Sequence, residues 1–391
     1  MSFPIININI NANVCKKYFA NVCIGVFYIV IITSCVIILV SITVTNRMYV
    51  KLANESKITL SGLAKLAGVS TSTVSRALNN NPVIKKETRE KLQALAIKHN
   101  FSLNRAASRL RTQKTNVVAV ILNLTDNTDQ SISDPFLLKV VGDLNQALNQ
   151  SGYELLLSNS FMATEDWANY FISSSRADGI IVIGQGKSTK KIEQVAKSGA
   201  PLVVWGDPIM ESNYTVVGSN NELGGYIATE HLINSGCKHI LFLGDPEHAE
   251  MSERYKGYNR ALQQYNIGLH DDLTLSCDIT SKVAYEKISQ LVLEKGLTFD
   301  GIVTSSDMVA LGALKALKER YVNIPNDVGI VGFDDIAMAE LFHPSLTTIK
   351  QNTKAAASIM VEQLLAQFHG QKAKSVVIDI ELIKRKSTRY S

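Results

Sequence analysis

Apolar residues recur every three or four positions in the stretch Leu60–Ala67, and this spacing predicts a short helix. Gly68 follows it, and glycine lets a chain that leaves a helix turn with a positive φ. Ser70 can then cap a second helix by accepting a free N–H of its first turn. A third helix is predicted at roughly Lys86–His99, which gives three short helices in close succession.

The first two helices have the spacing of a helix-turn-helix, a DNA-binding element. Small Ala64 lies where two helices would cross closely, four positions before Gly68, and Val69 and Val74 follow in register. The alternative is an αα-hairpin inside some other helical domain. Charge disfavours it, because residues 57–115 hold twelve Lys or Arg against two acids, a net +10. The remaining residues, 116–391, hold 24 bases against 32 acids, a net −8, so a nucleic-acid-binding module precedes an ordinary domain.

After Thr115 short apolar runs alternate with amphipathic helical stretches. The runs predicted as strands are Val117–Leu122, Glu154–Leu157, Gly179–Ile183, Leu202–Val204, His239–Leu243, Gly301–Thr304 and Val328–Gly332. The helices between them include Phe136–Gln150, Asn221–Ser235, Lys256–Tyr265, Asp307–Glu319 and Thr353–Phe368. Such alternation predicts an α/β region of doubly wound parallel sheets, and two sets of strands indicate two lobes. Ligands of open parallel sheets bind at the carboxyl ends of the strands, so a shared cleft is the expected binding site.

The N-terminal extension, residues 1–56, contains an uncharged run of 23 residues, Val22–Val44. Its length and apolarity suit a membrane-spanning helix, which is one interpretation. The other, which we favour, is a misplaced start, with translation beginning at Met48. A basic module intended for DNA would lie on the wrong side of a membrane in the simplest topology.

Motifs of catalysis are not found. Gly184-Gln-Gly186-Lys187-Ser188 lacks the first glycine of a phosphate-binding loop, because Ile181 stands there. The five cysteines and seven histidines show no metal-ligand spacing. The carboxylates of Asp334-Asp335 are sequence neighbours rather than a dyad across a cleft, and Asp335 is expected to cap the next helix. We therefore expect no enzyme activity, no cofactor and no metal.

The segments ITLSGLAKLAGVSTSTVSRALN and NRAASRLRT resemble the lactose-repressor/galactose-repressor family of bacterial regulators, and the resemblance extends from Ile58 to Thr388. It implies an all-α helix-turn-helix domain at residues 57–103, a hinge helix and linker at 104–115, and a two-lobed periplasmic-binding-protein-like effector and dimerisation domain at 116–391. The hinge helix would be disordered in the free protein and helical on DNA, because so short a helix is not stable alone.

The resemblance also assigns residues to DNA. Thr71, Ser72 and Arg76 occupy the base-contacting positions of the second helix, and Arg76 suits guanine in the major groove. The hinge helix begins at Asn104 and Arg105 and carries Leu110, which the family wedges into the central minor-groove step. A phosphate contact for Arg76 and ordinary dimer packing for Leu110 remain alternatives. Lys85 departs from the serine that commonly caps the third helix.

Residues 116 to about 217 would form the first lobe and 218 to about 344 the second, after which the chain returns to the first lobe. The resemblance places Phe136, Arg254 and Asp307 at the effector, although Asp307 would equally suit a helix N-cap. Two further residues at strand ends, Gln185 and Trp205, point toward the cleft, where an aromatic ring can stack on a sugar; Trp205 as interlobe core is the alternative.

The function implied is repression of carbohydrate-utilisation genes in the cytoplasm. A homodimer would bind a near-palindromic double-stranded operator under the control of a sugar-like effector. A membrane-anchored sugar sensor or solute-binding protein is the alternative, but such a protein has no use for a strongly basic helical module.

Overall fold

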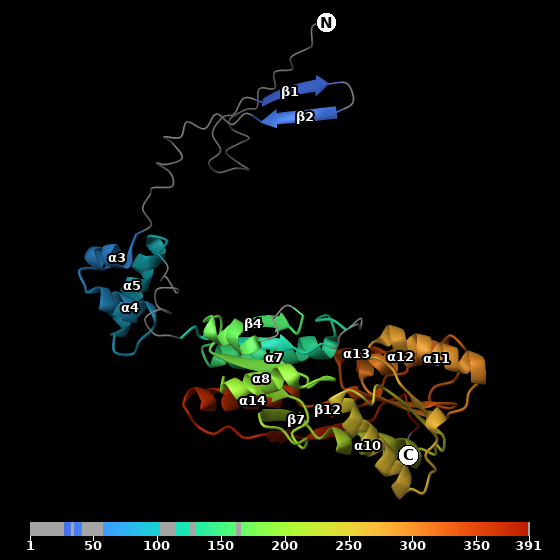
Figure 1. Cartoon of the computed structure of the whole chain (residues 1–391). Coiled ribbons are helices and arrows are strands. Elements are labelled where there is room, and N and C mark those ends of the chain that lie inside the picture. Colours follow the sequence, from blue (N-terminus) through green and yellow to red (C-terminus); the bar gives the residue numbers. More distant parts are fainter. Residues whose placement is uncertain are drawn as a thin grey trace. The chain divides into compact units, whose positions relative to one another are not determined.

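In a computed structural model of the chain, residues 58–101, 114–124, 130–161 and 166–389 are described in full, and residues 27–32 and 35–40 by their backbone. The chain divides into two compact units, residues 1–108 and 109–391 (Figure 1). Each unit is described below by itself.

The apolar N-terminal run contains two strands where it is described. β1 (Phe27–Ile32) pairs antiparallel with β2 (Cys35–Val40), and the run is rich in the β-branched residues that favour extended backbone. These twelve residues are therefore not part of the helix that a membrane-spanning interpretation requires. Within the described part of the chain, no helix has the length and apolarity needed to cross a bilayer.

Three helices form the head of the first unit: α3 (Leu60–Ala67), α4 (Thr71–Leu78) and α5 (Lys86–Lys98). The turn is the predicted one, because Gly68 ends α3 with φ 65° and the Ser70 hydroxyl accepts from the Thr73 amide at 3.1 Å. A small core closes it, composed of Leu63, Ala64, Val74, Ala77, Leu92 and Ala96. The helix-turn-helix prediction is confirmed, and Lys85 indeed gives α5 no side-chain cap.

The second unit contains two six-stranded sheets, each in its own lobe (Figure 1). The lobe 1 sheet has the order β13-β7-β6-β5-β3-β4, and the lobe 2 sheet has the order β14-β12-β11-β10-β8-β9. The lobe 1 strands are β3 (Val117–Leu122), β4 (Glu154–Asn159), β5 (Gly179–Ile183), β6 (Leu202–Trp205), β7 (Thr215–Ser219) and β13 (Val376–Ile378). The lobe 2 strands are β8 (Ile240–Leu243), β9 (Thr274–Leu275), β10 (Gly301–Thr304), β11 (Gly329–Asp334), β12 (Thr347–Gln351) and β14 (Ile380–Ile383). All described pairings in these sheets are parallel except that of β12 with β14.

Helices cover both faces of each sheet. In lobe 1 they are α7 (Pro135–Gln150), the π-helix η1 (Ala168–Ser173), α8 (Lys190–Ser198) and α14 (Thr353–Phe368). In lobe 2 they are α9 (Asn221–Asn234), α10 (Ala249–Gln264), the 3₁₀ turn η2 (Asp271–Leu273), α11 (Ser281–Lys295), α12 (Asp307–Lys318) and α13 (Ala337–Leu341).

Strand β3 shows how the two layers arise, because successive side chains of a strand point to opposite faces. Val118, Val120 and Leu122 join the core under α7 and α14. The intervening residues of β3 join the core under η1 and α8. An apolar run without polar alternation therefore builds two cores at once, which is why it predicts a buried parallel strand.

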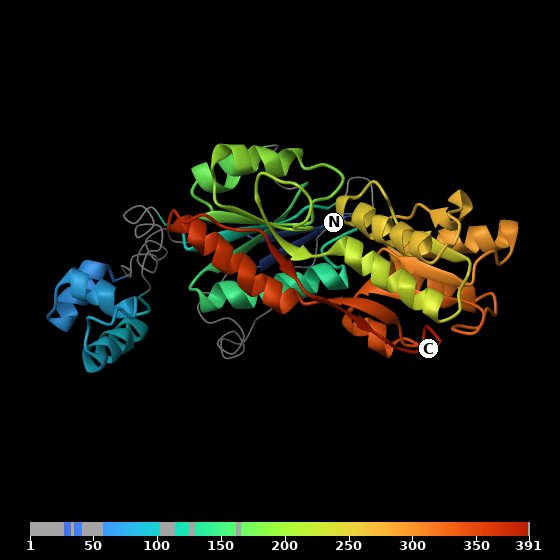
Figure 2. The ribbon, with the colours of Figure 1, turned by 90° about the horizontal axis from the view of Figure 1, so that it is seen from below.

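The chain passes between the lobes after β7, after β12 and after β13, so its return to lobe 1 comes later than expected. The sequence analysis placed that return near Pro344, but β12 still belongs to the lobe 2 sheet. A polar contact holds β12 in lobe 2, because the buried Thr347 amide donates a hydrogen bond to Ser387 Oγ of that lobe at 2.8 Å. Figure 2 shows α14 in red along lobe 1 and the C-terminus beside lobe 2.

Candidate functional site

The exposed face of α4 brings together the residues predicted to contact bases. Thr71, Ser72 and Arg76 are all exposed, whereas Val74 and Ala77 are buried against the other helices. Ser72 and Arg76 are four positions apart, so they lie one above the other on one side of α4. This face contains no acid in its first turn, which suits the approach of a phosphate backbone.

Lysines on α5 are used in a different way. Lys86 and Lys91 each lie within 4 Å of a glutamate one turn away, at 3.9 Å and 3.3 Å, with the four side chains strongly exposed. Such exposed pairs contribute little stability, and a role of these lysines in contacting phosphates or as a solvated face stays a prediction. The hinge residues Asn104, Arg105 and Leu110 lie outside the described residues, so their roles stay predictions.

A cavity of about 90 Å³ lies between the lobes. Lobe 1 lines it with Asn123, Leu124, Gln130, Asp134, Phe136, Leu137, Ile183, Gly184 and Trp205, and lobe 2 with His248, Glu250, Met251, Arg254, Ile279, Ser305, Ser306 and Asp334. Several of these residues end or follow β3, β5, β6, β10 and β11, where a parallel sheet places its ligands. Small-molecule pockets usually measure roughly 300–1,000 Å³, so the cavity is narrow in this arrangement, in which the two lobes are in contact with each other.

Two aromatic rings form the apolar wall of this cavity. Phe136 and Trp205 meet edge to face with ring centroids 5.9 Å apart. Trp205 is 5% exposed and belongs to the lobe 1 core, while Phe136 packs against the cores of both lobes. Trp205 is therefore both a core residue and part of the cavity wall, so the two interpretations of it were not exclusive.

Arg254 anchors the polar side of the cavity. Its Nε donates to Asn221 Oδ1 at 2.9 Å, its Nη1 donates to the carbonyl of Ser305, and its guanidinium lies 3.6 Å from the centre of the Phe333 ring. Burial lowers the pKa of the guanidinium, while surrounding carboxylates, with Asp334 first, act in the opposite direction. The group is thus a buried cation whose position is fixed by several partners.

Asp307 does not line the cavity, contrary to expectation. Its side chain is fully buried and accepts hydrogen bonds from Thr348 Oγ1 at 2.5 Å and from the Ile336 amide at 2.9 Å. It is not the helix cap either, because Ser306 caps α12 through the Val309 amide. Burial raises the pKa of this carboxyl to about 7. A contact between Asp307 and an effector stays a prediction.

Asp334 faces the cavity where Asp307 does not. It ends β11 with φ 118°, a conformation that non-glycine residues rarely adopt, and accepts from Gln351 Nε2 at 2.7 Å. The sequence analysis expected its neighbour Asp335 to cap α13, and this expectation is wrong. Instead Asp335 accepts from Arg385 Nη2 at 2.7 Å, and Ile336 is the cap residue of α13.

Gln185 also lies beside the cavity rather than in its wall. Its Oε1 accepts from the Asp207 amide at 2.8 Å, and its own amide donates to Glu250 Oε1 at 2.7 Å. Asp207 in turn accepts from the Asn221 amide and side chain, both at 3.1 Å. A chain of hydrogen bonds thus connects lobe 1 to Arg254 through Asn221.

A second set of contacts holds the lobes together at the edge of the cleft. Lys187 Nζ lies 2.6 Å from Asp245 Oδ2, and the Ala249 amide donates to the Gly186 carbonyl at 3.2 Å. His248 Nδ1 lies 3.0 Å from Glu250 Oε2, beside the bond from Glu250 to Gln185. The sequence analysis had rejected the glycine-rich loop as a phosphate site, and here that loop contacts the opposite lobe.

Among the polar residues that the sequence analysis did not predict are Glu250 and Asp334, which line the cavity, and Asp207 and Asn221, which lie beside it. Asp334 had a usable signal, because it directly ends a buried strand, where ligand residues gather. Asp207 follows two residues after the end of β6 in the same way. Glu250 had no such signal, because a glutamate in the first turn of a helix is ordinary.

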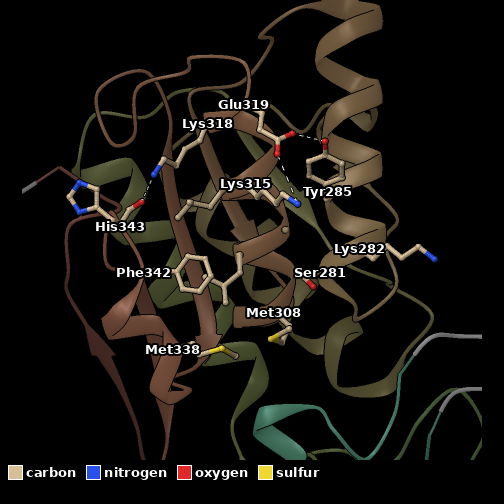
Figure 3. Close-up of a pocket in the computed structure, with 13 residues that line it drawn as sticks. Ser281, Lys282, Tyr285, Met308, Lys315, Lys318, Glu319, Met338, Phe342 and His343 are labelled. Carbon is tan, nitrogen blue, oxygen red and sulfur yellow. Dashed lines mark hydrogen bonds and ion pairs between the residues drawn. The ribbon is translucent and has the colours of Figure 1, made fainter.

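The largest cavity described, of about 670 Å³, is a separate groove on lobe 2 (Figure 3). Its walls come from α11, α12 and the region of α13, with Met308, Met338 and Phe342 among the lining residues. Figure 3 shows Lys315 and Tyr285 both directed to Glu319 at its rim. It does not reach the strand ends that form the cleft. Among the described residues no cluster of His, Cys, Asp or Glu could hold a metal ion.

Comparisons with known proteins agree with this architecture. The family described as bacterial regulatory proteins, lacI family, matches residues 59–104, and the periplasmic binding protein-like domain matches residues 229–388. The chain is 30% identical over 338 residues to the HTH-type transcriptional regulator MalR of Clostridium butyricum, which covers 84% of this chain and 98% of that protein.

Solved structures show the same fold. The lac repressor dimer bound to operator and the anti-inducer ONPF matches with a TM-score of 0.71 at 24% identity, covering 85% of this chain and 99% of that one. A transcriptional regulator CelR–cellobiose complex matches with a TM-score of 0.63 at 25% identity, covering 84% of this chain and 99% of that one. The chain therefore belongs to the lacI family of bacterial regulatory proteins, which are helix-turn-helix regulators of transcription.

Proposed function

We propose that this protein is a repressor that binds its operator as a homodimer and responds to a small sugar held between its lobes. The observation that carries the DNA half of the proposal is the exposed α4 face with Thr71, Ser72 and Arg76. A homodimer presents this face twice, to two half-sites of a near-palindrome. We infer no catalytic role and place the protein in the cytoplasm, where it meets chromosomal DNA.

On the operator, Arg76 donates two hydrogen bonds to a guanine. Thr71 and Ser72 have short side chains, and they make weak or water-mediated contacts to neighbouring bases. The hinge from Asn104 and Arg105 folds into a helix against the minor groove, and Leu110 opens the central base step. The hinge assignments rest on the family resemblance.

The effector half of the proposal rests on the cavity. A wall of two aromatic rings opposite a fixed guanidinium and a carboxylate suits a sugar, which has apolar ring faces and a hydroxyl-bearing edge. The related CelR was solved with cellobiose, which supports a carbohydrate. Effector binding favours the closed lobes and thereby releases the operator, so the regulated genes would serve carbohydrate use.

The apolar groove on lobe 2 is a suitable surface for the second copy. Leu341 next to it is 80% exposed, and Phe342, which lines it, is 38% exposed. A contiguous exposed apolar patch, unlike a single apolar side chain, often marks a surface that another protein covers. Exchange of Leu341 for aspartate should shift the chain from dimer to monomer in sedimentation velocity.

DNA binding is tested with the full chain. A double-stranded operator is selected from random DNA, and its affinity is compared with that of random competitor for Arg76→Ala. We expect operator affinity to fall by about 5- to 150-fold for each half-site, the value of one good bidentate base contact, while salt-sensitive non-specific binding remains.

Lys98→Ala, which removes the same charge at the end of α5, is the matched control and should retain specificity. Equal loss in both variants would show that Arg76 contributes only charge. If the wild-type chain prefers no sequence at all, the proposed function is wrong.

A further inference from the structure

The charges that line the cleft cavity are mostly negative. Three carboxylates face it, from Asp134, Glu250 and Asp334, against the single guanidinium of Arg254 and the side chain of His248. No lysine is among the residues that line it in the described part of the chain. Such a cavity differs from the sites that bind phosphates, which gather several cationic groups or free backbone amides.

Two of these carboxylates have one oxygen engaged by the protein and one without a partner. Asp134 Oδ1 accepts from the Phe136 and Leu137 amides at 2.9 and 3.1 Å, as the cap of α7. Asp334 Oδ1 accepts from Gln351 Nε2. In the described residues neither second oxygen has a hydrogen-bond donor. Glu250 differs, because its Oε1 accepts from the Gln185 backbone amide and its Oε2 lies 3.0 Å from His248 Nδ1, although no hydrogen bond joins those two atoms.

Asp134 and Asp334 belong to different lobes and are close enough to affect each other. Burial chiefly raises the pKa of Asp334, and the charge of Asp134 raises it further. Burial likewise raises the pKa of Asp134. Hydroxyl donors between the two groups would satisfy both carboxylates and link lobe 1 to lobe 2.

The one guanidinium has few hydrogen-bond donors left for an anionic ligand. Two of the nitrogens of Arg254, Nε and Nη1, already donate to Asn221 and to the Ser305 carbonyl, which leaves Nη2. The positive charge of Arg254 already interacts with the carboxylates of Asp334, Glu250 and Asp207. A phosphate or carboxylate entering the cavity would therefore meet carboxyl groups, whose pKa values its charge would raise further, without a cation free to compensate it.

Ser305 adds an independent hydroxyl-binding group to the same cavity. Ser305 lines the cavity and is 0% exposed, yet its Oγ has no hydrogen-bond partner among the described residues. A buried hydroxyl without a partner costs stability, and such groups are normally satisfied. A hydroxyl ligand can both donate to and accept from Ser305 Oγ.

We infer that the effector is an uncharged, hydroxyl-rich sugar whose hydroxyls bridge Asp134 of lobe 1 and Asp334 of lobe 2, and that this cleft rejects phosphorylated and acidic sugars. The inference rests on the proposed function and narrows its effector. The carboxylate pair gives both selectivity against anions and a reason for the lobes to close on the ligand.

The test uses matched probes on the full chain, by thermal shift followed by calorimetry. Each unphosphorylated sugar of a panel is compared with its phosphorylated or oxidised partner: glucose with glucose 6-phosphate and gluconate, ribose with ribose 5-phosphate, and cellobiose and maltose with their phosphates. Inorganic phosphate is the ionic control. We expect only uncharged sugars to bind, with each anionic partner about 100-fold weaker or more.

Asp134→Asn and Asp334→Asn keep the size of the side chain and remove its charge. In either variant the preference for the uncharged partner should fall at least 10-fold, while the uncharged sugar itself binds less tightly. Glu253→Gln removes the same charge from α10 outside the cavity and should leave the preference unchanged. Thermal unfolding of each variant confirms that it is folded.

The outcomes separate the two proposals. An anionic sugar that binds more tightly than its uncharged partner and changes operator affinity overturns the inference and leaves the proposed function standing. An unchanged preference in both Asp variants also overturns the inference. If no sugar of either kind binds or alters operator affinity, the proposed function fails and the inference fails with it.

Discussion

Lobe 1 lines the cleft cavity mainly with apolar side chains, whereas lobe 2 lines it mainly with charged and hydroxyl-bearing ones. The lobe 1 wall is a continuation of that lobe's core, because Leu137, Ile183 and Trp205 belong to both. The lobe 2 wall is built from Arg254, Ser305 and Asp334, and hydrogen bonds below the surface fix the side chains of Arg254 and Asp334.

The difference separates two tasks in one cavity. An apolar wall supplies contact area that is tolerant of ligand identity, while fixed polar groups discriminate between ligands. Substitutions in the lobe 2 wall should therefore lower the free energy of unfolding more than those in the lobe 1 wall, since removing one member of a buried charged set leaves its partners unsatisfied. The predictions below test this asymmetry.

The largest effect is expected for Arg254→Ala in lobe 2. The change leaves Asp334, Glu250 and Asn221 without their buried partner, so unfolding free energy should fall by about 3–5 kcal/mol. Urea denaturation measures it. Arg260→Ala on the same helix α10 is the control, because its pair with Glu222 is exposed and should cost about 1 kcal/mol or less. Equal losses would contradict the assigned role of Arg254.

The second prediction concerns the buried carboxyl beneath the lobe 2 wall. Burial raises the pKa of Asp307 from 3.8 to about 7, so the folded state binds more protons than the unfolded state between these values. Stability should therefore fall as pH rises from about 4 to about 7, by up to about 1.4 kcal/mol per pH unit for one group.

Asp307→Asn should flatten this slope, as measured by denaturation at several pH values. The same substitution at Asp272, an exposed carboxylate in η2, should leave it unchanged. A slope as steep in Asp307→Asn as in the unaltered chain would contradict the raised pKa of this carboxyl, whereas a shallower remaining slope is expected from Asp334 and Asp134, whose pKa values burial also raises.

Sequence patterns predicted the helix-turn-helix and the central strands because both depend on local signals. Gly68 and Ser70 act within a few residues of their own positions, and β3 and β5 are unbroken apolar runs. Each of these signals depends on nearby residues and not on contacts with distant parts of the chain.

Strands with polar residues were not predicted. β7 (Thr215–Ser219) and β12 (Thr347–Gln351) contain Thr, Ser, Lys or Gln, which the hydrophobic pattern treats as surface. Thr348 is nevertheless fully buried, and its hydroxyl donates a hydrogen bond to Asp307, 41 positions earlier in the chain. The same hydrogen bond engages Asp307, which does not line the cavity, so one long-range contact bears on both the unpredicted strand and the position of this aspartate.

In lobe 1, Phe136→Leu should have a moderate effect. The substitution keeps an apolar side chain and removes the edge-to-face contact with Trp205, which is worth about 0.5–1.5 kcal/mol. Thermal denaturation measures the loss. Phe161→Leu serves as control, because Phe161 is 54% exposed and has no ring partner in the described residues. A loss as large as that of Arg254→Ala would remove the asymmetry between the lobes.

The smallest effect is expected where the lobes touch at the edge of the cleft. Lys187→Met removes the ion pair with Asp245, which is partly exposed and contributes about 1 kcal/mol or less, so overall stability should barely change. The closed arrangement is held by few contacts of this kind, however, and its population should fall. Of the two tryptophans, only Trp205 lines the cavity, so acrylamide quenching in a Trp167→Phe background reports opening.

Quenching should rise in Lys187→Met and, at about 1 M salt, in the unaltered chain, since salt screens the same pair. Salt should add little to the variant. Lys190→Met, an exposed lysine at the start of α8, should leave quenching as it was. Equal quenching in all three chains would place the resistance to opening in the buried bonds among Gln185, Glu250 and Asn221, and thus in the polar side that lobe 2 presents to the cleft.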